Sequence, residues 1–214
     1  MKFVRWMMAA AAAAGVVFVA SGYDKEDSVG PHGSGSSAEA SKVKCDTLES
    51  LQTAAEKGDA EAQFQLAMRY LKGDGVKRDE KKGLDLIRKS AAQKNLSARA
   101  MLGMGYLLGQ VPGGSKEDGL SMIRQSAEQG NPYGKTALAS CYMQGYGGVE
   151  KNREEGLRLL REAAESGLAD AQVALGYQYM EKNEEEAMKW FQKAADQGYE
   201  DAKEALKRFR WTLW

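Results

Sequence analysis

The chain has 214 residues, with 30 basic side chains, 30 acidic side chains and a single histidine. This balance leaves no net charge and no basic stripe, which argues against a nucleic-acid partner. The histidine, His32, has no ligand-type neighbour near it in the sequence, so we predict a solvated residue, no metal site and no cofactor.

The first 21 residues have the order of a secretory signal peptide. Lys2 and Arg5 precede an apolar or small run from Trp6 to Ala20, and a charged stretch follows Gly22. The run is short for a membrane span of about 20 residues. We therefore predict cleavage near residue 21 and a periplasmic or secreted protein. An inner-membrane anchor formed by residues 6–22 is the alternative, and we expect membrane attachment only if this segment stays uncleaved.

Residues 22–44 are rich in glycine, serine, alanine and charged side chains. Such a segment cannot bury enough apolar surface to offset the entropy lost on ordering it. We predict a flexible Gly/Ser-rich linker there, with the folded part of the chain at residues 45–214.

A repeat of about 36 residues runs through this folded part. Its phase is marked by tyrosines at intervals of 36, 36 and 37 residues, namely Tyr70, Tyr106, Tyr142 and Tyr179. A leucine precedes each of them by four residues: Leu66, Leu102, Leu138 and Leu175. A fixed period of this length is typical of stacked supersecondary units and not of an enzyme with one central cleft. Because every unit has the same residue at the same phase, we interpret the tyrosines as core residues.

Each unit is predicted to contain two helices, A and B. In helix A of the first unit, Ala62, Leu66, Ala67 and Tyr70 share one helical face. Helix B is expected to begin at residues with preferred N-cap side chains: Asp79, Ser115, Asn152 and Asn183. A small residue inside helix B indicates close packing: Gly83, Gly119, Gly156 and Ala187.

The ends of helix B divide the folded part into units. Glycines expected at positive φ end these helices: Gly58, Gly130, Gly167 and Gly198. Lys94 takes this place once, with Asn95 as a substitute. The units are a half-unit at 46–57, full repeats at 58–94, 95–130, 131–167 and 168–198, and a terminal helix at 199–214. Asp46 with Glu49 is expected to cap the first helix.

Three motifs resemble the Sel-1-like repeat family, whose members are relatives of tetratricopeptide repeats. They are Ala62-Gln63-x-x-Leu66-Ala67-x-x-Tyr70-x-x-Gly73-x-Gly75-Val76, Ala171-Gln172-x-x-Leu175-Gly176-x-x-Tyr179 and Glu186-Ala187-x-x-Trp190-x-x-Lys193-Ala194-Ala195-x-Gln197-Gly198. The resemblance implies an all-α, right-handed superhelical solenoid of antiparallel helix pairs. It also implies a protein-interaction scaffold, which is often exported in bacteria. The turn is altered in the second unit and nearly deleted in the fourth, and we expect neither departure to change the fold.

Some cysteine-rich members of the family have been described as β-lactamases or penicillin binders. Ser41 and Lys44 have the Ser-x-x-Lys spacing of such enzymes but fall in the predicted linker, and Lys135-Thr136-Ala137 only approaches Lys-Thr-Gly. We therefore predict a protein that is not an enzyme, with an envelope hydrolase as the alternative. Nitrocefin turnover with and without Ser41 would distinguish them. Cys45 and Cys141 are two repeats apart, so we expect unpaired or intermolecular thiols.

Helix A is expected to line the inner, concave surface of the solenoid. Its side opposite the Ala-Leu-Tyr stripe carries methionines and tyrosines, which suit capture of a peptide or helix. We predict that a protein or peptide partner binds at Met68, Met101, Met104, Tyr133 and Tyr177. Packing against the protein's own helix B is the alternative for these residues. Trp211 and Trp214 are predicted to form a second docking end, or else to cap the last core layer.

Overall fold

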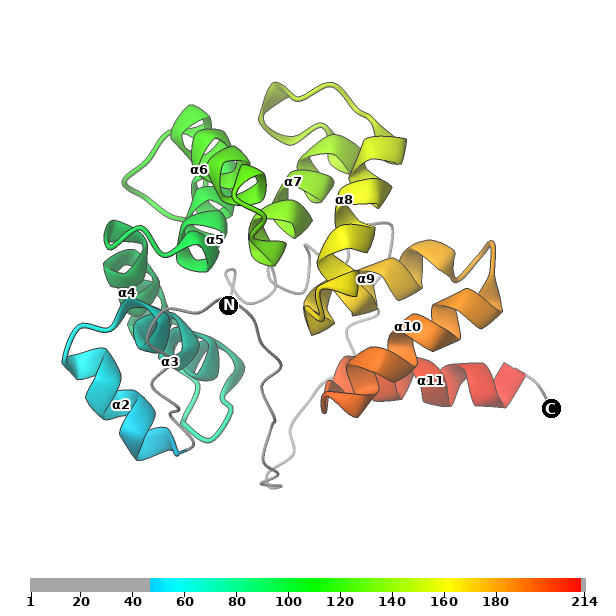
Figure 1. Ribbon diagram of the computed structural model, residues 1–214, viewed down its shortest axis with the longest axis horizontal. Coiled ribbons are helices and arrows are strands. Elements are labelled where there is room, and N and C mark those ends of the chain that lie inside the picture. Colours follow the sequence, from blue (N-terminus) through cyan, green and yellow to red (C-terminus); the bar gives the residue numbers. More distant parts are fainter. Residues whose placement is uncertain (1–46, 213–214) are drawn as a thin grey trace.

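The computed structural model describes residues 47–212, with side chains as far as residue 208. This part of the chain consists of helices and turns: α2 (Leu48–Glu56), α3 (Ala60–Lys72), α4 (Glu80–Ala92), α5 (Leu96–Leu107), α6 (Lys116–Glu128), α7 (Pro132–Gln144), a 3-10 turn (Tyr146–Gly148), α8 (Arg153–Glu165), α9 (Ala169–Tyr179), α10 (Glu184–Asp196) and α11 (Glu200–Thr212). Consecutive helices pack on one another. They follow each other around a curved stack that begins with α2 and ends with α11 (Figure 1). The predicted all-α solenoid is confirmed.

Several predictions concern segments outside the described residues. These are the signal peptide at 1–21, the linker at 22–44, His32, Ser41, Cys45 and Trp214, together with the side chain of Trp211. Between residues 47 and 212, no helix is both long enough and apolar enough to cross a bilayer.

The predicted helix B caps are confirmed. Asp79, Ser115, Asn152 and Asn183 each accept a hydrogen bond from the amide three residues later. The first helix differs from the prediction of Asp46 with Glu49. Its N-cap is Thr47, which has extended backbone and accepts from the Ser50 amide, while the Ser50 hydroxyl oxygen accepts from the Thr47 amide. A reciprocal capping box therefore begins α2 one residue later than expected.

Four of the five junctions between helix B and the next helix A have glycine at positive φ, as predicted: Gly58, Gly130, Gly167 and Gly198. At the fifth, Lys94 itself takes a φ of 65°. Asn95 does not substitute for the glycine, because its side chain caps α5 by accepting from the Ala98 amide. Lys94 is thus the one described non-glycine residue with positive φ, a conformation that costs about 1 kcal/mol for a residue with a Cβ atom.

Replacing the exposed Lys94 with glycine should stabilise the protein by about 1 kcal/mol, because glycine adopts this conformation without a steric cost. Urea unfolding of both proteins measures the change. The matched control is Lys57→Gly, since Lys57 precedes its junction in right-handed backbone with a φ of −72°. That variant should gain nothing, and a Lys94→Gly protein no more stable than its parent would contradict the explanation.

The repeated leucines are buried: Leu66, Leu102, Leu138 and Leu175. The repeated tyrosines are partly buried and pack against the same core clusters, as expected for core residues: Tyr70, Tyr106, Tyr142 and Tyr179. The altered turns leave both flanking helix pairs intact, because α5 still packs on α6 and α9 on α10.

The small residue inside helix B marks a close approach of helices A and B within each unit. A Cβ atom on Gly119 would lie 2.3 Å from the Gly103 carbonyl oxygen and 2.8 Å from the Leu107 nitrogen. At Gly83 and Gly156 the nearest atoms belong to the side chains of Leu71 and Met143, and backbone oxygens follow at 3.2 Å and 3.0 Å. The sequence-based interpretation of close packing is confirmed.

Candidate partner-binding surface

Two of the residues predicted to line a partner groove lie in the core. Met101 is 5% exposed and Met104 is 1% exposed. Met101 packs in a cluster with residues of α3 and α4, and Met104 in a cluster with residues of α6 and α7. The prediction that they face an open groove is wrong, because α5 is enclosed by α4, α6 and α7 and has little free surface.

Met68, Tyr133 and Tyr177 are partly exposed. The Tyr133 ring packs edge-on against Phe64, with centroids 5.2 Å apart, and Tyr177 packs in the same way against Phe191 at 4.9 Å. Phe64 belongs to α3 and Tyr133 to α7, so the first and third units touch on the inner side of the stack. This contact shows how strongly the solenoid curves.

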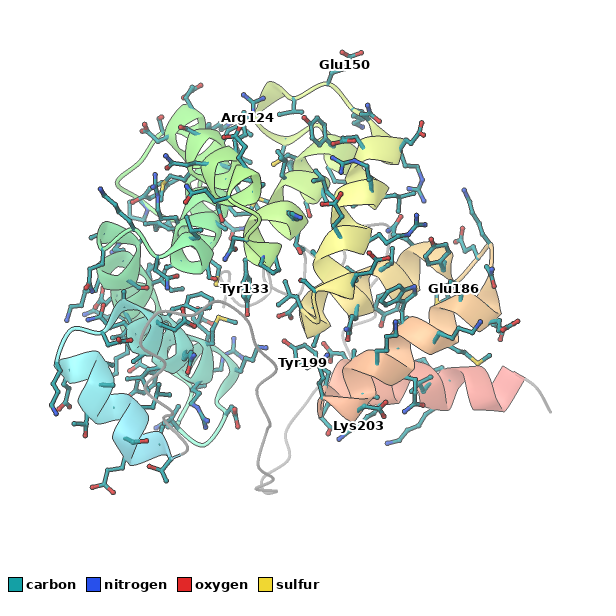
Figure 2. All side chains as sticks on the ribbon, viewed as in Figure 1. Arg124, Tyr133, Glu150, Glu186, Tyr199 and Lys203 are labelled. Atoms are coloured by element: carbon teal, nitrogen blue, oxygen red, sulfur yellow. The ribbon has the colours of Figure 1, made fainter. Side chains whose placement is uncertain are left out.

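A cluster of polar side chains lies at the centre of this curve. Lys72 ends α3, Asp170 lies in the first turn of α9, and Tyr199 immediately precedes α11. The Lys72 ammonium donates to the Tyr199 hydroxyl oxygen at 2.6 Å, and the Tyr199 hydroxyl donates to Asp170 at 2.7 Å. Lys72 and Asp170 also form an ion pair at 3.9 Å. We call Lys72, Tyr133, Asp170 and Tyr199 the central cluster; Figure 2 shows its two tyrosines on the inner side of the stack.

The cluster ends a ladder of hydrogen bonds that follows the repeat. At three of the junctions the next residue reaches back to the preceding unit, first where Asn95 donates to Glu61 at 2.9 Å and then where Asn131 donates to Ser97 at 3.0 Å. Leu168 at the same position has no side chain that could form such a bond. Tyr199 and Asp170 occupy the equivalent positions in the last pair. These bonds share one pair of repeat positions, and Lys72 of the first unit joins the last of them.

The environment of the cluster is electrically negative. Burial, followed by the carboxylate of Asp170, raises the pKa of Tyr199 and also that of Tyr133. Burial raises the pKa of Asp201, and the carboxylates of Glu204 and Asp170 raise it further. The positive charge of Lys72 lowers it. Carboxylates of α3, α9 and α11 are thus gathered around the cluster. The positive charge of Lys72 partly compensates them.

The sequence contained one signal for Tyr199 that the predictions did not use. The residue after each junction is otherwise Asp59, Asn95, Asn131 or Leu168, and the first three cap a helix A. A tyrosine there departs from the pattern. The proximity of Lys72 and Asp170 follows only from the curvature of the whole stack.

The residues resembling a hydrolase motif have structural partners. Lys135 forms an ion pair with Glu162 at 2.7 Å, and the Thr136 hydroxyl donates to the Pro132 carbonyl oxygen. Cys141 is a buried free thiol, and burial raises its pKa to about 12. A thiol of this kind is an unreactive core group at neutral pH. Residues 47–212 contain no group of three acidic, histidine or cysteine side chains placed to hold a metal ion.

Comparison with known proteins agrees with this architecture. The family model of the Sel1 repeat matches residues 60–95, 97–131, 132–168 and 169–199. The chain belongs to the Sel1 repeat family. No curated protein matches it.

Solved structures give similar folds. The immunity protein Pa5087 from Pseudomonas aeruginosa is 27% identical, with a TM-score of 0.52 over 94% of this chain and 68% of that one. PA5086 from the same organism is 31% identical, with a TM-score of 0.51 over 72% of this chain and 58% of that one. The protective antigen c5321 of uropathogenic Escherichia coli is 36% identical over 72% of this chain, with a TM-score of 0.48. This Sel1-repeat chain spans only 34% of the c5321 chain.

Proposed function

We propose that this Sel1-repeat protein is a scaffold that binds a partner protein on its inner surface, around the central cluster. The observation that carries the proposal is the convergence of partly exposed aromatic and charged side chains from α3, α7, α9 and the start of α11. Tyrosine rings offer a large contact area at a low entropy cost, and their hydroxyl groups add polar specificity. The family membership supports the same role.

The outer helices provide a contrast. Their exposed charged side chains form local ion pairs one helical turn apart, such as Arg158 with Glu155 and Lys189 with Glu185. In such a pair each charge already has a partner on its own helix, and because both are exposed to water the pair contributes little to stability. Side chains from distant units meet instead at the inner surface, which favours it as the binding surface.

Two matched glutamines allow the proposal to be tested. Gln65 on α3 and Gln192 on α10 are both exposed, and each donates to a carboxylate four residues away, on Glu61 and Asp196 respectively. Gln65 lies on the inner side of the stack and Gln192 on an outer helix. Immobilised parent, Gln65→Arg and Gln192→Arg proteins should be used to capture partners from envelope extract, with quantitative mass spectrometry as the measurement.

We expect Gln65→Arg to lower capture of the principal partner at least tenfold, a loss of about 1.4 kcal/mol in binding. Gln192→Arg should capture as well as the parent. Both variants should unfold within about 0.5 kcal/mol of the parent, as exposed substitutions usually do. Equal capture by all three proteins, or loss only with Gln192→Arg, would contradict binding at the inner surface.

A more specific candidate is an immunity function, in which the partner is a toxin protein. The similarity to the immunity protein Pa5087, at 27% identity over 94% of this chain, supports it. A source strain lacking the gene should lose viability in contact with its parent and regain it with a plasmid copy. Equal survival of the two strains would remove this candidate.

We also propose that the protein acts in the periplasm or after secretion, on the basis of the charge and apolar pattern of residues 1–21. The intact mass of the protein purified from cells should show removal of about 21 residues. Recovery of the full chain in the membrane fraction would favour the anchor instead.

A further inference from the structure

We propose that Asp170 and Tyr199 form a recognition site for a lysine side chain of the partner protein, and that Lys72 occupies this site in the free protein. The proposal rests on the proposed function, because it names the chemical group of the partner that the inner surface recognises. It makes Lys72 an internal competitor of the partner.

The geometry around the Lys72 ammonium is that of a bound cation. The nitrogen lies 2.6 Å from the Tyr199 hydroxyl oxygen, 3.9 Å from an Asp170 carboxylate oxygen and 4.4 Å from the centroid of the Tyr199 ring. Because the Tyr199 hydroxyl donates its proton to Asp170, its lone pairs are left to accept from the ammonium. The site thus combines a hydrogen-bond acceptor and a carboxylate at the hydroxyl end of an aromatic ring.

Negative charge around the site exceeds what one lysine neutralises. Asp201 and Glu204 of α11 act on the same region as Asp170, and Glu61 of α3 acts on the neighbouring Tyr133. The other cations of this region, Lys203 and Arg208 of α11, are outnumbered by the carboxylates of the same helix: Glu200, Asp201 and Glu204. A cation therefore remains favoured at this place when Lys72 leaves.

Lys72 is placed to leave. Its side chain is 38% exposed and that of Asp170 is 35% exposed, and ion pairs at such exposure contribute little to stability. Lys72 is the last residue of α3, so its side chain can turn into solvent without breaking the helix. Because it joins the first unit to α9 and the start of α11, its exchange for a partner's lysine would also free the inner surface between them.

The shape of the site favours lysine over arginine. One carboxylate and one phenol oxygen meet the ammonium from the side of a ring, which suits a compact point charge. Arginine binds best where two acceptors are presented in parallel to its planar fork, and the Asp170 oxygen near Lys72 already accepts from Tyr199.

Vacating the site tests the proposal directly. In Lys72→Ala, the neutral-capped amino acid Nα-acetyl-lysine methylamide should bind in place of the missing side chain. The measurement is a titration of the Tyr199 ring signals by NMR in protein with labelled tyrosine, assigned by comparison with Tyr199→Phe. We expect saturable shifts with a dissociation constant in the millimolar range, and binding to the parent at least about fivefold weaker because Lys72 competes.

Three controls make the result specific. The uncharged isostere Nα-acetyl-norleucine methylamide should produce no saturable shift, and neither should the lysine probe with the double variant Lys72→Ala/Asp170→Asn. Lys82→Ala vacates a comparable arrangement, in which Lys82 lies 5.4 Å from the Tyr70 ring centroid and 4.0 Å from Asp79. Asp79 caps α4, and among the side chains of residues 47–208 no hydroxyl group is hydrogen-bonded to Lys82, so we expect no binding there.

Equal responses to the lysine and norleucine probes, or no response in a folded Lys72→Ala protein, would overturn the proposal. If Lys72→Ala does not fold, Lys72→Met keeps the apolar stem of the side chain and serves in its place. If the lysine probe did not bind, loss of partner capture in Gln65→Arg would still support the proposed function. The proposed function and the lysine site can therefore fail separately.

Discussion

Replacing Gly119 with alanine should destabilise the solenoid by about 3 kcal/mol, because α5 and α6 would have to move apart. The added Cβ atom would lie 2.3 Å from the Gly103 carbonyl oxygen and 2.8 Å from the Leu107 nitrogen. Both are backbone atoms and cannot rotate away. The contact is reciprocal, since a Cβ atom on Gly103 would lie 2.7 Å from the Gly119 carbonyl oxygen.

Gly83→Ala is the matched control at the same repeat position. Its Cβ atom would lie 2.7 Å from the buried Leu71 side chain, while the nearest backbone atom, the Ala67 carbonyl oxygen, is at 3.2 Å and not at 2.3 Å as in Gly119→Ala. The helix propensity of alanine, better than that of glycine by about 1 kcal/mol, offsets part of the cost. We therefore expect a loss of about 1 kcal/mol or less. Thermal and urea unfolding followed by circular dichroism compare the two, and a Gly119→Ala protein as stable as Gly83→Ala would show that the helices separate easily.

Met104→Lys should destabilise the protein by about 4 kcal/mol, because it places an ammonium group in the core without a partner. Met104 is 1% exposed and shares a cluster with Leu107, Ile123 and Leu138. Met68→Lys is the control. Met68 is partly exposed on the inner side of α3, so its lysine can reach water, and we expect a loss of about 1 kcal/mol or less.

The measurement for both methionine variants is thermal unfolding combined with the partner-capture assay. A Met104→Lys protein that has the melting temperature of the parent but captures no partner would show that Met104 belongs to the binding surface. Early melting of Met104→Lys together with normal melting and weakened capture of Met68→Lys would support the division between core and inner surface.

The helices, their caps and most junctions could be predicted because they depend on near neighbours in sequence. The side chains of Asp79 and Asn152 each accept a hydrogen bond from an amide three residues later. Gly130 has a positive φ because it ends a helix, which is a local requirement of the backbone. The exceptions were also local. The N-cap of α2 is Thr47 and not the predicted Asp46. Lys94 itself has the positive φ, and Asn95 caps the next helix.

The candidate site was predicted only in part. Tyr133 lies on the inner side (Figure 2), and Tyr177 is partly exposed with its ring against Phe191 of α10, whereas the equally periodic Met101 and Met104 are buried. A helical period identifies which residues share a face, but it does not say how far the neighbouring units close over that face. Burial of α5 depends on α4, α6 and α7 together.

By itself, the sequence determined the family, the helix pairs and the positions of the small packing residues, since each unit is specified by its own residues and its immediate neighbours. The tertiary structure alone decided that Lys72 meets Tyr199, 127 residues further along the chain, and Asp170. The physical reason is the curvature of the stack. Small rotations between successive units add up over the whole solenoid, and only their sum brings its two ends together around the central cluster.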